Sequence, residues 1–191
     1  MLRRQFGSNF REASEILVVE RLRWRLRMGV VFQSTALFDS LTVGENILFS
    51  LELREEYDAE NKDEVVRGLL GMVDLADYID AYPSDLSTGH RRAVAIARAL
   101  AAQPECILYD EPTTMVDPIM GDHLAMLMLR LKEQLRLTSV VVTHDLALMR
   151  RVADKVVVLH EGRAIYFGPV SGLEDSDHPH IQEFLAMDRV G

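Results

Sequence analysis

Two adjacent carboxylates in the middle of the chain are the first residues whose types and spacing suggest chemistry. In the segment CILYDEP (106–112), four mostly apolar residues lead directly into Asp110 and Glu111, and Pro112 ends the run. A run of this kind is typical of a buried strand in a parallel sheet, and its carboxyl end is where open α/β sheets bind ligands. Buried carboxylates need a cation, a metal or solvent. The pair therefore predicts a metal site, or simply a strand that ends in two solvated acids.

Two other predicted strands also end in polar residues. Residues 28–32 (MGVVF) are followed by Gln33, and residues 139–143 (SVVVT) are followed by His144. Since the carboxyl ends of parallel strands share one edge of a sheet, we expect Gln33, His144 and the acidic pair to lie together. Magnesium binds a few carboxylates, water and phosphate oxygens, and a carboxylate and a histidine can orient water and contact a transferring phosphoryl group.

A helix start completes the predicted chemistry. Ser87 is a good N-cap residue, and the alanine-rich segment 91–103 (RRAVAIARALAAQ) that follows is a strong helix former. The free backbone N–H groups and dipole at such a helix start favour anions. An ordinary capped helix is the alternative interpretation, but beside the polar strand ends the segment is consistent with a site for phosphate and magnesium.

The elements that must position these residues alternate along the chain, which predicts an α/β fold with a partly parallel sheet. The expected strands are residues 16–20, 28–32, 106–110 and 139–143, and 155–159 with a hairpin partner at 164–167. The expected helices are residues 43–53, 58–73, 91–103, 118–135, 146–152 and 179–187, with a short segment at 75–79. No internal repeat or low-complexity linker divides these elements, so we expect them to form one domain.

Composition limits the class of protein further. The chain has 191 residues, 48% of them hydrophobic and 27% charged, which is ordinary for one globular domain. Its formal net charge of −9 argues against charge-driven binding of nucleic acid. The single cysteine, Cys106, excludes an internal disulfide and fits a reducing compartment. We therefore expect a cytosolic protein that docks on a membrane partner if it meets a membrane at all.

The order and spacing of these pieces resemble the ATP-binding subunits of ABC transporters over residues 16–187. The matching parts are Gln33 (Q-loop), residues 86–90 (LSTGH, like the LSGGQ signature), residues 106–111 (Walker B and catalytic glutamate), Asp117 (D-loop) and residues 143–145 (THD, switch histidine). Within that family, segments 30–51 and 178–185 look most like the subunits of Mla/Mce-type lipid (phospholipid) transporters.

The resemblance implies a role for each matching residue at the sheet edge. Asp110 would hold Mg²⁺ through water, and Gln33 would complete the metal shell and sense the membrane partner. Glu111 would polarise the attacking water, and His144 would contact the γ-phosphate of ATP. Glu111 and His144 are thus the expected catalytic residues, and ATP and Mg²⁺ are the expected cofactors.

The same resemblance implies partners. Ser87 and Gly89 would reach the γ-phosphate of an ATP held by a second ATPase subunit, and Asp117 would also contribute to nucleotide binding. Residues that follow Gln33 would form a helical subdomain that grips transmembrane permease subunits at the cytoplasmic face of a membrane. Nucleic acid is not an expected partner.

The resemblance also predicts how the chain is organised. Residues 1–33 would be a remnant of the N-terminal core that ends at the Q-loop, and residues 34–103 would be the helical subdomain with the signature helix. Residues 104–170 would form the α/β core with Walker B, the D-loop and the switch histidine, and residues 171–191 a C-terminal helix. This describes a truncated ABC ATPase domain of the P-loop NTPase type.

The expected truncation rests on a missing motif. No G-x-x-x-x-G-K-[ST] occurs in the 191 residues, so the Walker A loop that cradles phosphates is absent from them. The chain would then be a fragment, a degenerate remnant, or a subunit that acts only in trans, and the first two are favoured. Thr88 and His90, in place of the usual signature residues, point the same way.

Two functional expectations and one structural expectation follow from that absence. The chain would be an energy-coupling subunit of a lipid transporter that hydrolyses little ATP by itself. The alternative is a non-catalytic module that binds a membrane subunit or a full-length ATPase. In either case, a sheet without its first strands would expose an apolar edge.

Overall fold

Three parallel strands form the central sheet of the computed structural model, which describes residues 27–52 and 61–187. β1 (Met28–Val31) pairs with β2 (Cys106–Asp110), and β2 pairs with β3 (Thr138–Val142), all in parallel. The strand order β1-β2-β3 places the three predicted polar strand ends at the same edge. The predicted parallel α/β sheet is therefore confirmed for these strands, whereas the predicted strand at residues 16–20 lies outside the described residues.

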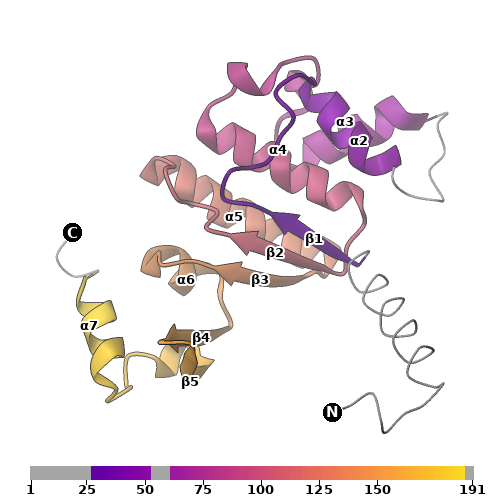
Figure 1. Cartoon of the computed structure of the whole chain (residues 1–191). Coiled ribbons are helices and arrows are strands. Elements are labelled where there is room, and N and C mark those ends of the chain that lie inside the picture. The colour runs from indigo at the N-terminus through magenta and orange to yellow at the C-terminus, as the bar shows by residue number, and fades with distance from the viewer. Residues whose placement is uncertain (1–26, 53–60, 188–191) are drawn as a thin grey trace, which may run out of the picture.

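Helices connect the strands and cover the sheet (Figure 1). The α-helices are α2 (Val43–Glu52), α3 (Lys62–Met72), α4 (Thr88–Ala101), α5 (Pro118–Leu135), α6 (Leu146–Val152) and α7 (Pro179–Met187). Short 3₁₀ turns are η3 (Ala76–Tyr78), η4 (Pro83–Asp85) and η5 (Val170–Gly172). Figure 1 shows α2, α3 and α4 grouped on one side of the sheet, away from the C-terminal elements. Of the helix expected at residues 58–73, the structure describes residues 61 onward, and α3 accounts for most of that part.

Helix α4 is the main buried helix among the described residues. It begins three residues earlier than the sequence predicted, directly after the Ser87 cap, because the Ser87 side chain accepts a hydrogen bond from His90 N. Small alanine side chains let the helix approach its neighbours closely, and α4 packs against α2, α3, α5 and β1. Helix α4 contacts α2 and α3 as well as the sheet. Its position therefore fixes how the group formed by α2, α3 and α4, here called the helical group, lies against the sheet.

A separate antiparallel hairpin follows α6. β4 (Lys155–His160) pairs with β5 (Arg163–Pro169) in a two-stranded sheet, as the sequence predicted. The two turn residues, Glu161 and Gly162, have φ values of 47° and 75°. Positive φ at both central residues matches the twist of the flanking strands, which is why a glycine is useful at the second position.

Two hydrophobic cores result from this arrangement. The larger one joins the central sheet to α2–α6, whereas the smaller one is built from Leu146, Leu173, Ile181 and Leu185 with side chains of β4 and β5. Between them, Val140 and Val142 of β3 remain 46% and 51% exposed. Among the described strands, β3 therefore forms an exposed apolar edge of the kind that the sequence predicted. None of the described helices is both long enough and apolar enough to cross a bilayer.

Candidate functional site

The strand register places the predicted site residues level with one another. Val31 of β1 is paired with Tyr109 of β2, so Gln33 and Glu111 each lie two residues beyond a matched pair. Asp110 is paired with Val142 of β3, which precedes the Thr143-His144 step. Gln33 is exposed and Asp110 is half-buried. The structure thus brings the ends of all three strands to one edge, as the sequence predicted.

A left-handed backbone at Glu111 aims its carboxylate. Glu111 has a φ of 47°, which is uncommon for a residue with a side chain. The conformation is held by two contacts: Glu111 N donates to Val142 O (2.9 Å), and Thr114 Oγ1 donates to Glu111 Oε2 (3.0 Å). Strain of this kind persists only where neighbouring contacts fix it, and it is often found at functional sites. Here the strained turn directs one carboxylate oxygen toward the end of β3.

That oxygen meets His144. His144 Nδ1 lies 2.9 Å from Glu111 Oε1, with the histidine side chain 74% exposed and the glutamate side chain 20% exposed. The hydrogen bond that the Glu111 carboxylate accepts, together with its negative charge, raises the pKa of His144 above the ordinary histidine value. The contact uses Nδ1 and leaves Nε2 of the same ring directed elsewhere. The two predicted catalytic residues therefore form a joined pair.

Asp145 fixes the loop that carries His144. Its side chain caps α6 by accepting a hydrogen bond from Leu148 N (3.0 Å) and also accepts one from Thr113 Oγ1 (2.9 Å). Asp145 N in turn donates to Thr143 Oγ1 (3.0 Å). The loop after β2 and the loop after β3 are consequently tied to each other on both sides of the Glu111–His144 pair.

A buried arginine from α4 ties two strand ends together. Arg92 is only 3% exposed, and its guanidinium donates to Phe32 O (2.7 Å) and to Thr114 O (3.3 Å). Phe32 directly precedes Gln33, and Thr114 is the residue that holds Glu111. Burial lowers the pKa of Arg92, and the negative charge of Asp110 partly opposes this effect. Arg92 is therefore a buried cation close to the acidic strand end.

A second arginine holds the loop after Gln33. Arg98 donates to Ala36 O (2.6 Å) and Thr35 O (3.0 Å), and both of these loop residues have positive φ values, 49° and 62°. Burial lowers the pKa of the Arg98 guanidinium. Two arginines of α4 therefore bind the backbone on both sides of Gln33: Arg92 contacts the residue before it, and Arg98 contacts the loop after it.

The predicted nucleotide-binding residues Ser87, Gly89 and Asp117 form another group. Asp117 caps α5 by accepting from Met120 N (2.9 Å), as Ser87 caps α4. A Cβ atom placed on Gly89 would lie 2.0 Å from Met120 Cγ, so the starts of α4 and α5 are in close contact there. Within the described residues, no hydrogen bond joins this group to the Glu111–His144 pair. Its predicted role toward a second subunit stays a prediction.

The donor set at the sheet edge fits a magnesium ion that keeps much of its water. No cluster of three or more His, Cys, Asp or Glu side chains suited to a metal occurs in residues 27–52 and 61–187. Magnesium commonly takes one or two carboxylates and completes its shell with water and phosphate oxygens. Asp110, with Gln33 at the end of the neighbouring strand β1, offers that kind of partial shell. This placement supports the predicted metal role without testing it.

Sequence reasoning missed Arg92 and Arg98 as residues that shape the site, and it named Asp145 only as part of the 143–145 motif. A signal for Arg92 was present, because it lies four residues before Ile96 and seven before Ala99, on the apolar stripe of α4. A charged residue on such a stripe indicates a buried partner. Nothing comparable marks Arg98, whose partners are backbone carbonyls of a distant loop.

Comparison with known proteins identifies the family of this chain. The family described as ABC transporter matches residues 6–114. The methionine import ATP-binding protein MetN of Staphylococcus haemolyticus is 38% identical over 183 residues, which cover 95% of this chain and 52% of that protein. The probable sulfate/thiosulfate import ATP-binding protein CysA of Chlorella vulgaris is 40% identical over 163 residues, covering 84% and 68%.

Solved structures agree as well. The ATP-binding cassette MJ0796, whose dimeric structure was solved bound to ADP and Pi, matches with a TM-score of 0.66 and 33% identity, covering 75% of this chain and 63% of that one. The fold is that of an ABC ATPase domain, and the chain belongs to the ABC transporter family. The chain spans about half the length of several curated relatives that it matches.

Proposed function

We propose that this chain is part of an ABC transporter subunit that binds Mg²⁺–ATP at the carboxyl edge of its parallel sheet and couples ATP hydrolysis to transport. The observation that carries the proposal is the 2.9 Å contact between Glu111 and His144, at an edge shared with Gln33 and Asp110. A base, a proton donor and magnesium ligands at one edge suit phosphoryl transfer to water.

Each residue then has a distinct task. Mg²⁺–ATP, when bound, supplies the phosphoryl group that is transferred. Glu111 accepts a hydrogen bond from the attacking water and takes its proton, while His144 presents Nε2 to the phosphate because Nδ1 faces Glu111. Asp110 and Gln33 would hold the metal through water when it is bound. Ser87, Gly89 and Asp117, at the starts of α4 and α5, act toward nucleotide held by a second ATPase subunit.

The helical group offers a surface for a membrane partner. Phe38 and Phe49 are 43% and 44% exposed, and their rings pack edge to face with centroids 5.0 Å apart. The loop that carries Phe38 is the one that Arg98 holds just after Gln33. We propose that transmembrane permease subunits dock here, at the cytoplasmic face of a membrane, and that α4 passes their movement to Gln33.

The transported compound is a finer part of the proposal. The relatives MetN and CysA are named for methionine import and sulfate/thiosulfate import, and they give the predicted lipid transport no support. The lipid prediction rests on the likeness of segments 30–51 and 178–185 to lipid transporter subunits. Uptake of methionine, sulfate and phospholipid can be measured in cells that lack the gene and in cells to which it has been restored. The compound whose uptake depends on the gene distinguishes lipid transport from methionine or sulfate import.

Equilibrium dialysis with labelled ATP, with and without Mg²⁺, tests the nucleotide site. We expect Mg²⁺-dependent binding with a dissociation constant of about 1 mM, because the phosphate-cradling motif is missing from this sequence. Asp110→Asn should weaken the Mg²⁺-dependent part about tenfold, whereas Asp63→Asn, on the exposed surface of α3, should not. Glu111→Gln should retain binding.

Two results would overturn this proposal. Binding that is absent, or that responds equally to Asp110→Asn and to the control, would remove the metal–nucleotide site. In that case the alternative, a non-catalytic interaction module, predicts that the chain still co-purifies with a permease or a full-length ATPase and that Phe49→Ser abolishes this. Rapid hydrolysis by the chain alone, lost in Glu111→Gln, would contradict only the expectation of little turnover.

A further inference from the structure

The backbone of Gly89 does not explain why this residue is a glycine. Gly89 lies in the first turn of α4, and its φ is not positive. A residue with a side chain can adopt the same helical conformation, and alanine is a better helix former than glycine. A neighbouring group must therefore account for the missing side chain.

Met120 of α5 fills the space in which a side chain at position 89 would lie. A Cβ atom placed on Gly89 would be 2.0 Å from Met120 Cγ, 2.8 Å from its Sδ and 3.3 Å from its Cβ. Gly89 is buried and Met120 is half-buried. Any side chain at position 89 would therefore displace Met120 from the start of α4.

The preceding position offers an internal comparison. The LSGGQ signature has glycine at the positions of both Thr88 and Gly89, but this chain has a threonine at the first. Thr88 Oγ1 accepts a hydrogen bond from the Arg91 guanidinium (3.3 Å), so this side chain is engaged within α4. Of the two positions, the chain has its glycine at the one that packs against Met120.

Met120 also connects this contact to the cap of α5. Asp117 accepts a hydrogen bond from Met120 N (2.9 Å), and Ser87 accepts one from His90 N (3.1 Å) at the start of α4. The backbone of Met120 is thus held by one cap, while its side chain lies against Gly89 beside the other. The two capped helix starts meet through a single side chain.

The contact has room to change. A cavity of about 420 Å³ lies beside it and is lined in part by Met120, His90, His123 and Met126. Methionine has three rotatable side-chain bonds and adapts to irregular spaces. Rotation of the Met120 side chain into this cavity would loosen the contact without unfolding either helix.

We infer that Met120 is a positioning residue that couples the Asp117 cap of α5 to the start of α4, and that Gly89 is a glycine because it must admit the Met120 side chain. The coupling itself needs no nucleotide. Its use rests on the proposed function, in which Ser87, Gly89 and Asp117 act toward nucleotide held by a second ATPase subunit. Because coupling between two sites is reciprocal, a ligand that moves the start of α4 also alters the start of α5.

Hydrogen exchange at the His90 amide, followed by NMR without nucleotide, tests the coupling, because the Ser87 cap protects this N–H. Asp117→Ala removes the α5 cap, and we expect about fivefold faster exchange at His90. In a Met120→Ala background, the same substitution should change the rate by less than about twofold. Met120→Leu, which keeps an apolar side chain of similar volume, should retain the coupling. Met126→Ala, on the same helix and beside the same cavity, is the matched control and should also retain it.

A double-mutant cycle tests the reason for the glycine. Gly89→Ala should lower the midpoint of urea unfolding by about 0.5 M, because the added methyl group displaces Met120. In the Met120→Ala background, Gly89→Ala should leave the midpoint unchanged or raise it, since no long side chain is then displaced and alanine favours the helix.

Two sets of results would overturn the inference. Exchange at His90 that ignores Asp117→Ala, or that responds equally with and without the Met120 side chain, would show that Met120 does not couple the caps. Equal losses from Gly89→Ala in both backgrounds would show that the glycine is required for another reason, such as contact with a ligand. Neither measurement uses nucleotide, so a failure of ATP binding would contradict the proposed function and leave the coupling standing.

Discussion

At the scale of single residues, the Glu111–His144 pair carries most of the proposed chemistry. Glu111 raises the pKa of His144, first through the hydrogen bond and then through its charge. A pKa raised in the folded state stabilises the fold below the unfolded pKa, and this contribution is lost as pH rises through the folded value. Because His144 is largely exposed, solvent keeps the contribution small. The pair is therefore better suited to function than to stability.

Glu111→Gln should lower the pKa of His144 toward the ordinary value of about 6.5, because the glutamine carries no charge. A pH titration of the His144 ring followed by NMR measures this directly. Glu133→Gln, at an exposed position on α5, is the matched control and should leave the His144 titration unchanged. Identical midpoints in wild type and Glu111→Gln would show that the contact does not exist in solution.

Arg92 gives a second prediction at this scale. Arg92→Met keeps the length and packing of the side chain but leaves Phe32 O and Thr114 O without their donor. We expect a loss of about 1–3 kcal/mol in the free energy of unfolding by urea. Arg91→Met removes the neighbouring arginine, whose hydrogen bonds are longer at 3.3 and 3.5 Å, and should cost less. Equal losses in the two variants would argue against a special role for Arg92.

At the scale of elements, side-chain caps fix where three helices begin. Ser87 starts α4, Asp117 starts α5 and Asp145 starts α6, each by accepting a backbone N–H. Each cap lies within or beside a motif that the sequence analysis singled out. The same residues thus define helix geometry and the predicted site, so a substitution there tests both.

Ser87→Ala should reduce the free energy of unfolding by about 0.5–2 kcal/mol through loss of the α4 cap. Ser87→Asn, which can still cap, should retain most of that stability. Chemical denaturation of the two variants measures the difference. If Asn destabilises the fold as much as Ala does, the cap has no measurable role and Ser87 must act in another way.

Much of this element scale could be predicted from the sequence. The bounds of α5, α6 and α7 follow from proline, capping residues and helical periodicity, and the shared edge of Gln33, Asp110 and His144 follows from parallel strands. The left-handed backbone of Glu111 could not be predicted, because it depends on contacts with Val142 and Thr114 that form only in the folded chain. The domain boundaries expected at residues 33, 103 and 170 remain predictions.

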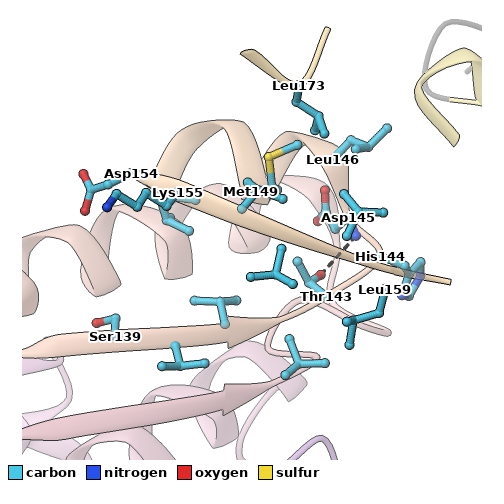
Figure 2. A pocket seen from close by; sticks show the side chains of 18 of the residues that line it. Ser139, Thr143, His144, Asp145, Leu146, Met149, Asp154, Lys155, Leu159 and Leu173 are labelled. Carbon is cyan, nitrogen blue, oxygen red and sulfur yellow. Dashed lines mark hydrogen bonds between the residues drawn. The ribbon is translucent and has the colours of Figure 1, made fainter. Parts of the chain in front are cut away.

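At the scale of the whole molecule, a cleft between β3 and β4 separates the two hydrophobic cores of the described residues (Figure 2). The large core contains the three-stranded sheet, whereas the small one rests on a two-stranded hairpin and α7. An isolated hairpin with little packing is marginally stable. The sequence predicted an exposed apolar edge, but not that the hairpin would face β3 across an open cleft, because strand order is a tertiary property.

Native-state hydrogen exchange should therefore reveal two units. Amides of β4 and β5 should exchange through an opening that costs less free energy than the opening of β2 and α4. Low denaturant should open the hairpin unit first. Identical opening free energies for both groups would mean that the two cores do not open separately.

The most direct test of the central claim is paramagnetic broadening of amide NMR signals by Mn²⁺–ATP, since Mn²⁺ also favours oxygen ligands. If the three strand ends form one metal–nucleotide site, the signals of Gln33, Glu111 and His144 should broaden together. Those of Met28 and Thr138, at the opposite edge of the sheet, should persist. Broadening at both edges, or none near Glu111 and His144, would contradict the account.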